Sequence, residues 1–458
     1  MRSVLQLVAS IAHLGAALLL STSATAEVAT APIAPEALRA DLRLVEETIE
    51  RLHPDLAHSV NPARLKQAIA ELERQLGHPM NQEEAWATLA QLNPVFADGH
   101  VLIGLPDWRS ESASALQHGA SFFPFEVSVD AAGRVVIVSA LGGAATPLAG
   151  ARIMQIDGRA GKVAGALLAR AHGDTAASRA ALVSQRWWLF HSKLYGMPAA
   201  YDLVLEGTPD REVHVDASHV LPEVLAREAS FERLFGCELR PDGGAVLTVG
   251  SFNWPDKPRF FKFTGDCFAR IKASGARRLV IDVRQNGGGD DDLWKDGILR
   301  YIANRPYRHG SWYVKRDTAG QRVRGVIESW TEPVPIEPLR FDGEVIVLVG
   351  SLTYSSAVLF ANVVQDFGFG SVAGTGGTVR SRQSGGVQSI RLPNSGLTLS
   401  YPRFVLRRPS DEKGAALVDP DFPLVDDPLC PAAAIDHLLR PHRGAPADAA
   451  TSAARPIP

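Results

Sequence analysis

Two adjacent serines stand where an apolar strand pattern gives way to a helical pattern. Residues 343–366 contain an apolar, β-branched run, a short polar corner with Ser355 and Ser356, and then a helical repeat. A serine at a strand-to-helix turn exposes its hydroxyl and lies beside the unpaired backbone N–H groups of the helix start. A nucleophilic serine needs this position, so the segment predicts hydrolysis by acyl transfer.

A nucleophilic serine also needs a base and donors for the oxyanion, and two further segments contain such residues. His100 follows Asp98 and Gly99 in a predicted turn, from which its ring could point across a domain boundary. Three glycines at 287–289 follow an apolar strand, and glycine lets backbone N–H groups approach a ligand closely. An oxyanion hole, a phosphate cradle and a flexible turn all fit these glycines, but the Lys-Ser/Thr of a P-loop is missing. A lone histidine is more often structural than catalytic.

The segment 410–421 contains two acids that could orient a histidine, Asp411 and Glu412. Acids in such a loop are more often solvated charges. The serine corner does not fit the Gly-x-Ser-x-Gly elbow of α/β-hydrolases, and the best histidine precedes the serine instead of following it. The α/β-hydrolase arrangement is therefore excluded.

The sequence around these residues divides into three patterned regions. Apolar residues recur at helical spacing between residues 38 and 92, which predicts a small helical bundle. From about residue 122 to 215 the period shortens toward two, which indicates a mostly β segment. From about residue 244 strand and helix patterns alternate, and the apolar centre of 278–283 is typical of a sheet covered on both faces. We expect an N-terminal helical domain at 27–118, a β-rich module at 119–216 and an α/β core at 217–440.

The N-terminus resembles a secretory signal peptide. Arg2 precedes an apolar run at 4–20, and the small-x-small pattern of 24–26 offers a cleavage site before Glu27. An N-terminal membrane anchor is the alternative, although polar residues interrupt the run. We expect residues 1–26 to be removed and the protein to be periplasmic or secreted. The Pro/Ala/Ser-rich end, 441–458, is expected to be disordered.

Composition limits the partners and cofactors. The 458 residues carry a formal charge of −3 without a basic block, which argues against nucleic acid and anionic membranes as partners. The spacing of the three cysteines and of the histidines does not fit a structural zinc site, and no metal or cofactor is expected. In an oxidising compartment Cys237 and Cys267 could pair, and the alternative is three unpaired thiols.

Taken together, the segments resemble the tail-specific, or C-terminal processing, serine protease family. This family also includes the tricorn core protease and the repeats of interphotoreceptor retinoid-binding protein. The order and spacing of the motifs agree from about residue 35 to 440. The matching segments are 98–100, 279–289, 349–357, 374–377, 392–397 and 418–421.

The resemblance implies a crotonase-like open α/β core, preceded by a helical N-terminal region and a PDZ-like middle module. By motif, Ser355 takes the place of the family's nucleophile. The backbone N–H groups of Gly288 and Ser356 take the place of its oxyanion hole, with Gly287 beside them.

The family activates its serine in two ways. The processing proteases use a lysine, and its place holds Arg380, which stays protonated and cannot be a base. The tricorn-like branch uses a histidine, here His100, assisted by a late glutamate. Glu412 is the nearest match to that glutamate, and Asp411 is its competitor.

Two departures and one added module complete the resemblance. A glutamate common after the nucleophile is Val358 here, and the serine before the tricorn histidine is Gly99. The PDZ-like segment, with Gly150 and Ile153, and Tyr354 beside the nucleophile are expected to contact substrate. Packing alone is the other role open to that module.

The sequence therefore predicts a serine peptidase that acts on peptides or proteins. One alternative is a catalytically decayed binding or carrier protein on the same fold. A second is a hydrolase of small esters.

Overall fold

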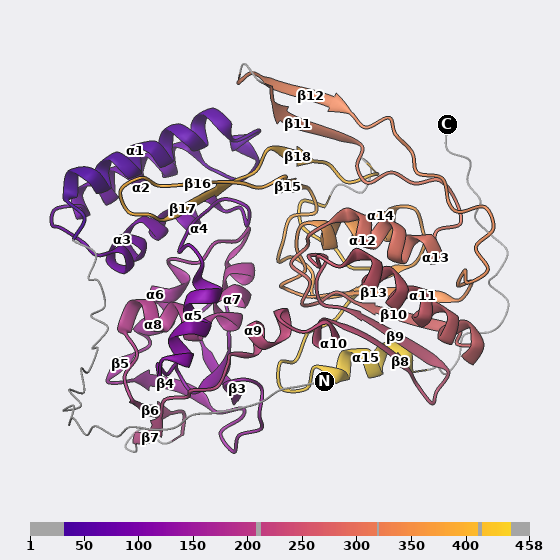
Figure 1. The fold of residues 1–458 in the computed structure, drawn as a ribbon, viewed down its shortest axis with the longest axis horizontal. Coiled ribbons are helices and arrows are strands. Elements are labelled where there is room, and N and C mark those ends of the chain that lie inside the picture. Colours follow the sequence, from indigo (N-terminus) through magenta and orange to yellow (C-terminus); the bar gives the residue numbers. More distant parts are fainter. Residues whose placement is uncertain (1–31, 208–211, 318–319, 411–414, 441–458) are drawn as a thin grey trace, which may run out of the picture.

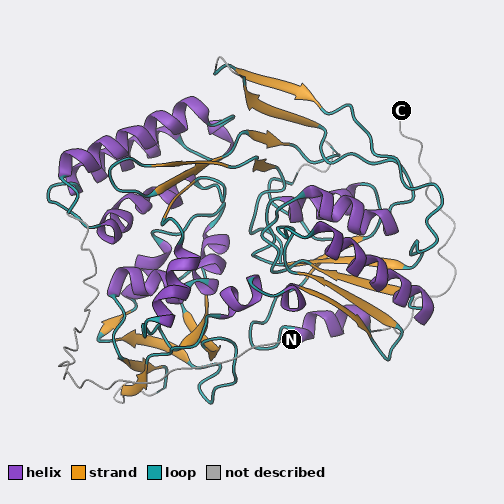
Figure 2. Cartoon of the chain, viewed as in Figure 1, coloured by secondary structure: helices purple, strands orange, loops and turns teal. Residues whose placement is uncertain are grey.

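The computed structural model describes residues 32–207, 212–317, 320–410 and 415–440. Figures 1 and 2 show two lobes: the N-terminal helices with a β-rich module on one side, and a helix-covered sheet on the other. Short strands from the C-terminal part of the chain connect the lobes across the top of this view. No described helix has the length and apolar character needed to span a membrane.

The N-terminal helices form as their apolar spacing predicts. Leu38, Leu42, Val45 and Ile49 make the buried face of α1. A capping box at Asn81 and Glu84 starts α3. The helices of this region are α1 (Pro35–Leu52), α2 (Pro62–Gln75), α3 (Gln82–Leu89), α4 (Asn93–Phe96) and α5 (Trp108–Gln117).

The middle module contains an antiparallel sheet in the order β2-β3-β4-β6-β7. Its strands are β2 (Phe125–Val129), β3 (Val135–Ala140), β4 (Arg152–Ile156), β5 (Arg159–Ala160), β6 (Ala200–Leu205) and β7 (Glu212–Asp216). Three helices pack with it: α6 (Lys162–Leu168), α7 (Ala176–Gln185) and α8 (Trp187–Tyr195). The period of the sequence in this region indicates mostly strands, so α7 and α8 are not predicted by it. Two short helices, α9 (Glu223–Glu228) and α10 (Phe231–Leu234), lead into the second lobe.

The second lobe is built on a mostly parallel sheet in the order β19-β14-β13-β10-β9-β8, with β8 antiparallel to β9. Its strands are β8 (Phe235–Leu239), β9 (Gly244–Val249), β10 (Arg278–Asp282), β13 (Glu344–Val349), β14 (Ser371–Gly374) and β19 (Phe422–Pro423).

Helices cover both faces of this sheet, as the apolar centre of β10 predicts. Residues of α11 (Lys257–Ser274) and α14 (Ser356–Asp366) share one apolar core with β9, β10 and β13. On the other face, Val280 and Ile346 pack with Leu438 of α15 (Ala432–Leu439). After β10 the chain forms α12 (Asp291–Trp294), a π-helical turn (Lys295–Leu299) and α13 (Arg300–Ile302).

The C-terminal segment crosses between the lobes. Four strands form a second antiparallel sheet on the core side: β11 (Trp312–Arg316), β12 (Arg322–Val326), β15 (Gln383–Gly385) and β18 (Phe404–Leu406). Between β15 and β18 the chain forms β16 (Gln388–Arg391) and β17 (Thr398–Tyr401), and β17 pairs with β1 (Leu102–Gly104). A segment assigned to the core by sequence therefore completes a sheet of the N-terminal lobe.

One disulfide joins β8 to α11. Cys237 and Cys267 are bonded, which confirms the predicted pairing, and Cys430 is free and exposed. The bridge closes a loop with a sequence separation of 30. A covalent link of this kind stabilises a fold mainly by restricting the unfolded chain.

Replacing both Cys237 and Cys267 by Ala should lower the free energy of unfolding by about 2 to 4 kcal/mol. Thermal or urea unfolding of the oxidised protein measures the loss. Cys430→Ala is the control and should unfold like the wild type. Equal stability of the double variant and the control would contradict a stabilising disulfide.

Candidate active site

The corner between β13 and α14 holds Ser355 in an unusual backbone conformation. Ser355 has φ +52° and ψ −124°, immediately before the first residue of α14. Such a conformation costs a non-glycine residue about 1 to 3 kcal/mol and persists only where its surroundings enforce it. Here the Ser355 N–H donates to Gln383 Oε1 at 3.1 Å, and the Tyr354 N–H donates to the Asn286 carbonyl at 3.0 Å. Both sides of the corner are thereby fixed.

The two serines of the corner differ in what their hydroxyls contact. Ser356 Oγ is buried, 2.6 Å from Asp291 Oδ1 and 2.7 Å from the Gly289 carbonyl. Ser355 is half-buried and lines a cavity of about 570 Å³ between the lobes. Of the two serines of the corner, Ser355 is therefore the one that can present its hydroxyl to a ligand in the cavity.

The glycine segment packs directly against this serine. Gly288 has φ +101°, and a Cβ built on it would lie 2.6 Å from Ser355 Cβ and 3.0 Å from Ser356 N. Only glycine can approach the corner so closely.

The N–H groups around the corner differ in their availability. The Gly288 N–H donates to Asn286 Oδ1 at 2.9 Å, so this predicted oxyanion donor already has a partner. The Gly287 and Ser356 N–H groups donate to no described residue. One donor without a described partner therefore belongs to the residue after Ser355, and the other to Gly287, which lines the same cavity as Ser355.

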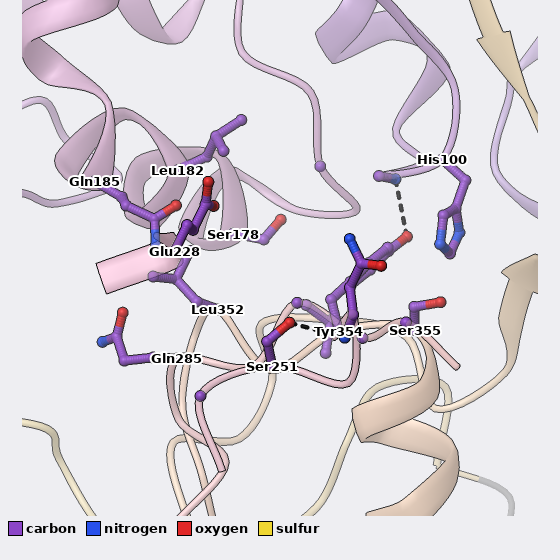
Figure 3. Close-up of a pocket in the computed structure, with 18 of the residues that line it drawn as sticks. His100, Ser178, Leu182, Gln185, Glu228, Ser251, Gln285, Leu352, Tyr354 and Ser355 are labelled. Carbon is purple, nitrogen blue, oxygen red and sulfur yellow. Dashed lines mark hydrogen bonds between the residues drawn. The ribbon is translucent and has the colours of Figure 1, made fainter. Parts of the chain in front are cut away.

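His100 lies at the same end of the cavity as Ser355 (Figure 3). Its ring is tilted against that of Tyr354, with 4.8 Å between the centroids. Its Nδ1 lies 2.9 Å from Ser384 Oγ, and Ser384 Oγ donates to Asp98 Oδ1 at 2.8 Å. Because the one hydroxyl proton of Ser384 is used on Asp98, its oxygen accepts from His100 Nδ1–H. We therefore assign the Nδ1–H tautomer, which leaves the Nε2 lone pair available as a base.

Burial and neighbouring charges set the protonation of this chain of groups. Burial lowers the pKa of His100, while the charges of Asp98 and Asp174 act against that effect. Burial would raise the pKa of Asp98, but His53 and His100 outweigh it and hold that pKa well below its usual range. The His53 Nε2 atom lies 3.8 Å from Asp98 Oδ2. A carboxylate at Asp98 and a neutral imidazole at His100 are the resulting states near neutral pH.

Arg380, at the place of the lysine base, has a structural role instead. Its guanidinium donates to the Ala97 carbonyl and lies 3.5 Å from Asp174 Oδ1. Asp174 Oδ1 in turn accepts from the Gly99 N–H at 3.0 Å and from the Tyr354 hydroxyl at 2.8 Å. These contacts fasten the loop that carries His100 to the corner that carries Ser355.

The structure describes some of the other predicted site residues and not others. Glu412 and Asp411 fall outside the described residues. Ile153 is buried in the middle sheet, and neither it nor Gly150 lines the cavity, whereas Tyr354 does. The described part of the chain contains no group of His, Cys, Asp and Glu side chains arranged to hold a metal ion.

Sequence reasoning missed the orienting residues of His100. The sequence analysis assigns Asp98 only to the turn that presents the histidine, although its position two residues before His100 is a usable signal. Ser384 carries no such signal, because 284 residues separate it from His100.

Comparison with known proteins adds a family and a fold. The sequence profile described as peptidase family S41 matches residues 245–424. No curated protein sequence matches the chain. The solved structure of mature CPAF complexed with lactacystin is similar to this chain, with a TM-score of 0.60 and 15% identity over 86% of this chain and 95% of that one. A CPAF mutant has a TM-score of 0.61 and 15% identity over 85% and 93% of the two chains. The photosystem II D1 C-terminal processing protease has a TM-score of 0.43 and 17% identity over 85% and 93%.

Gly288→Ala should disrupt the corner, because its Cβ would overlap Ser355 and its φ disfavours any side chain. We expect a loss of at least about 2 kcal/mol in the free energy of unfolding. Urea denaturation measures this loss. Gly287→Ala is the matched control, since a Cβ there meets nothing within 4 Å, and it should be tolerated. Equal stability of the two variants would contradict the close approach.

Proposed function

We propose that this serine-type peptidase cleaves peptide bonds with Ser355 as nucleophile and His100 as base. The α/β core of the protein, residues 245–424, belongs to peptidase family S41. One observation carries the proposal. The His100 Nδ1–H is held by Ser384, so that Nε2 is left free in the cavity that Ser355 lines. A neutral imidazole with a free lone pair beside a serine hydroxyl is the arrangement of a general base and its nucleophile.

The acylation step would begin with proton transfer from Ser355 Oγ to His100 Nε2 as Oγ attacks the substrate carbonyl. The imidazolium that forms is stabilised by the Asp98 carboxylate through the hydroxyl of Ser384. His100 then gives the proton to the leaving amine. A water molecule, deprotonated by the same ring, hydrolyses the acyl-enzyme and restores Ser355.

The developing oxyanion needs hydrogen-bond donors beside Ser355, and two backbone N–H groups are candidates. The Ser356 N–H has no partner within the described chain, and the N–H of Gly287 is equally free. The Gly288 N–H would serve only by leaving or sharing its bond to Asn286. We therefore assign the oxyanion to Ser356 together with the 287–288 segment.

We assign an orienting role toward His100 to Asp98 and Ser384. The orienting role of Glu412 or Asp411 stays a prediction, because both residues lie outside the described part of the chain. Asp98 and Ser384 are buried, and their bonds to each other and to His100 measure 2.8 and 2.9 Å. Asp98 Oδ1 also accepts the backbone N–H of His100 at 2.8 Å, so it fixes the loop as well as the ring.

A fluorophosphonate probe should label the wild-type protein at Ser355 and should not label Ser355→Ala. His100→Ala should label at least about 100-fold more slowly, because it removes the general base. Ser384→Ala should slow labelling about 10- to 100-fold, the worth of a hydrogen bond to a charged group. Rates are measured by mass spectrometry of the labelled peptide.

The pH dependence of the labelling rate shows whether Ser384 orients the His100 ring or only supports the fold. Labelling of the wild type should rise with pH to a midpoint below the ordinary histidine value of 6.5 and then level off, since burial lowers the pKa of His100. Ser384→Ala should move this midpoint lower, because the imidazolium loses its link to Asp98, whereas Ser384→Thr should keep it. A well-folded wild-type protein that is not labelled would favour a decayed carrier over a peptidase.

We also propose that the protein acts outside the cytoplasm, on the strength of the signal-like N-terminus and the Cys237–Cys267 bridge. N-terminal sequencing of the protein from an exporting bacterial host should give Glu27 as the first residue. Ala26→Arg should block processing and leave the precursor. A mature chain that still begins at Met1 would overturn the assignment.

A further inference from the structure

We propose that the active-site cavity binds a carboxylate of the peptide substrate through the guanidinium groups of Arg186 and Arg227. The inference rests on the proposed peptidase function. The carboxylate could belong to an acidic side chain or to the C-terminus of the substrate, because both present the same planar anion.

The side chains that line the cavity carry more positive than negative charge. The described charged residues that line it are Arg109, Arg186, Arg227 and Glu228, beside neutral polar and apolar side chains. Arg109 and Glu228 form a bidentate pair at 2.6 and 3.2 Å, so each offsets the other. His172 also lines the cavity, but burial, together with the charge of Arg186, lowers its pKa to about 3, so it is neutral. Two guanidinium charges therefore remain without a paired acid.

Arg186 makes no ion pair or side-chain hydrogen bond with any described residue. It lies between α7 and α8, with its guanidinium carbon 4.8 Å from the centre of the Trp108 ring, and its buried Nε has no partner. Burial, with Arg109 nearby, lowers the pKa of Arg186 to about 10, which leaves it charged at neutral pH. Arg186 is partly buried, and a partly buried charge without an acidic partner is costly, a cost that a bound anion would reduce.

Arg227, on α9, likewise makes no ion pair within the described chain. Three acids influence it from a distance: Glu223, Glu228 and Glu126. Glu223 is paired with Arg233 at 3.1 Å, and Glu228 with Arg109. Glu126 Oε1 accepts the backbone N–H groups of Gly142 and Glu223, and burial raises the pKa of Glu126. The nearby acids are thus engaged elsewhere.

The position of the arginines suits recognition rather than chemistry. In Figure 3, Gln185, which precedes Arg186, and Glu228, which follows Arg227, lie at the opposite end of the pocket from His100 and Ser355. An anion held there would anchor the substrate away from the scissile bond. A planar guanidinium fork matches a carboxylate in two parallel hydrogen bonds, so a carboxylate fits better than a spherical anion.

The test compares a tryptic digest of casein with the same digest after carbodiimide amidation of its carboxyl groups. The wild type should cleave the untreated peptides with a kcat/KM about 10- to 100-fold higher than the amidated ones, as expected for loss of charged hydrogen bonds. In Arg186→Met and in Arg227→Met this ratio should fall toward one. Arg134→Met is the matched control, since Arg134 is exposed, pairs with Asp130 in a hairpin and does not line the cavity, and it should keep the ratio.

Two synthetic versions of the best-cleaved peptide identify the source of the carboxylate. One carries a C-terminal amide, and the other has its acidic side chains replaced by Asn and Gln. The version with the lower kcat/KM contains the lost carboxylate. Circular dichroism checks the folding of each variant, and the two arginine variants test the proposal separately.

Failure of the carboxylate site and failure of the peptidase proposal would give different results. Equal cleavage of the two digests by the wild type, or an unchanged ratio in both folded arginine variants, would overturn the carboxylate site and leave the peptidase proposal intact. Absence of cleavage of either digest, with no fluorophosphonate labelling, would overturn the peptidase proposal itself.

Discussion

The candidate site depends on the buried carboxylate of Asp98. One of its oxygens accepts hydrogen bonds from the His100 backbone and from Ser384, which come from different lobes of the molecule. Removing such a carboxylate would leave two buried donors without an acceptor, at a cost of about 1 to 3 kcal/mol for each. The carboxylate is also the negative charge that a protonated His100 would face. The packing of the two lobes at the site and the proposed chemistry therefore both depend on this one carboxylate.

Around this carboxylate the molecule uses side chains where the family resemblance leads one to expect other groups. Arg380 occupies the place of a lysine base and fastens the Ala97 carbonyl and Asp174. Gly99 stands where tricorn has a serine, and Ser384 supplies a hydroxyl to the histidine from a different strand. The same function of holding an imidazole is thus met by residues that a motif comparison would not align.

The sequence predicted the local features well and the long-range ones poorly. The Ser355 corner, the glycine segment and the buried strand β10 follow from short-range patterns of apolarity, glycine and turn residues. The pairing of β1 with β17 has no local signature, because short strands with polar residues on one face resemble loops. Helices α7 and α8 escaped prediction although α7 begins with a capping box at Thr175. The arginines of the cavity were equally hidden, since their lack of partners is a property of packing.

The crossing segment has a consequence for how the chain reaches its active form. The N-terminal lobe receives β17 from a point about 300 residues after β1, and His100 receives Ser384 from the same segment. During synthesis the first lobe therefore emerges long before the strand that completes its sheet. Contacts of such large sequence separation form late and slowly. The His100 ring is consequently held by Ser384 only once this late segment has docked, so a chain that ends before residue 384 cannot form this contact.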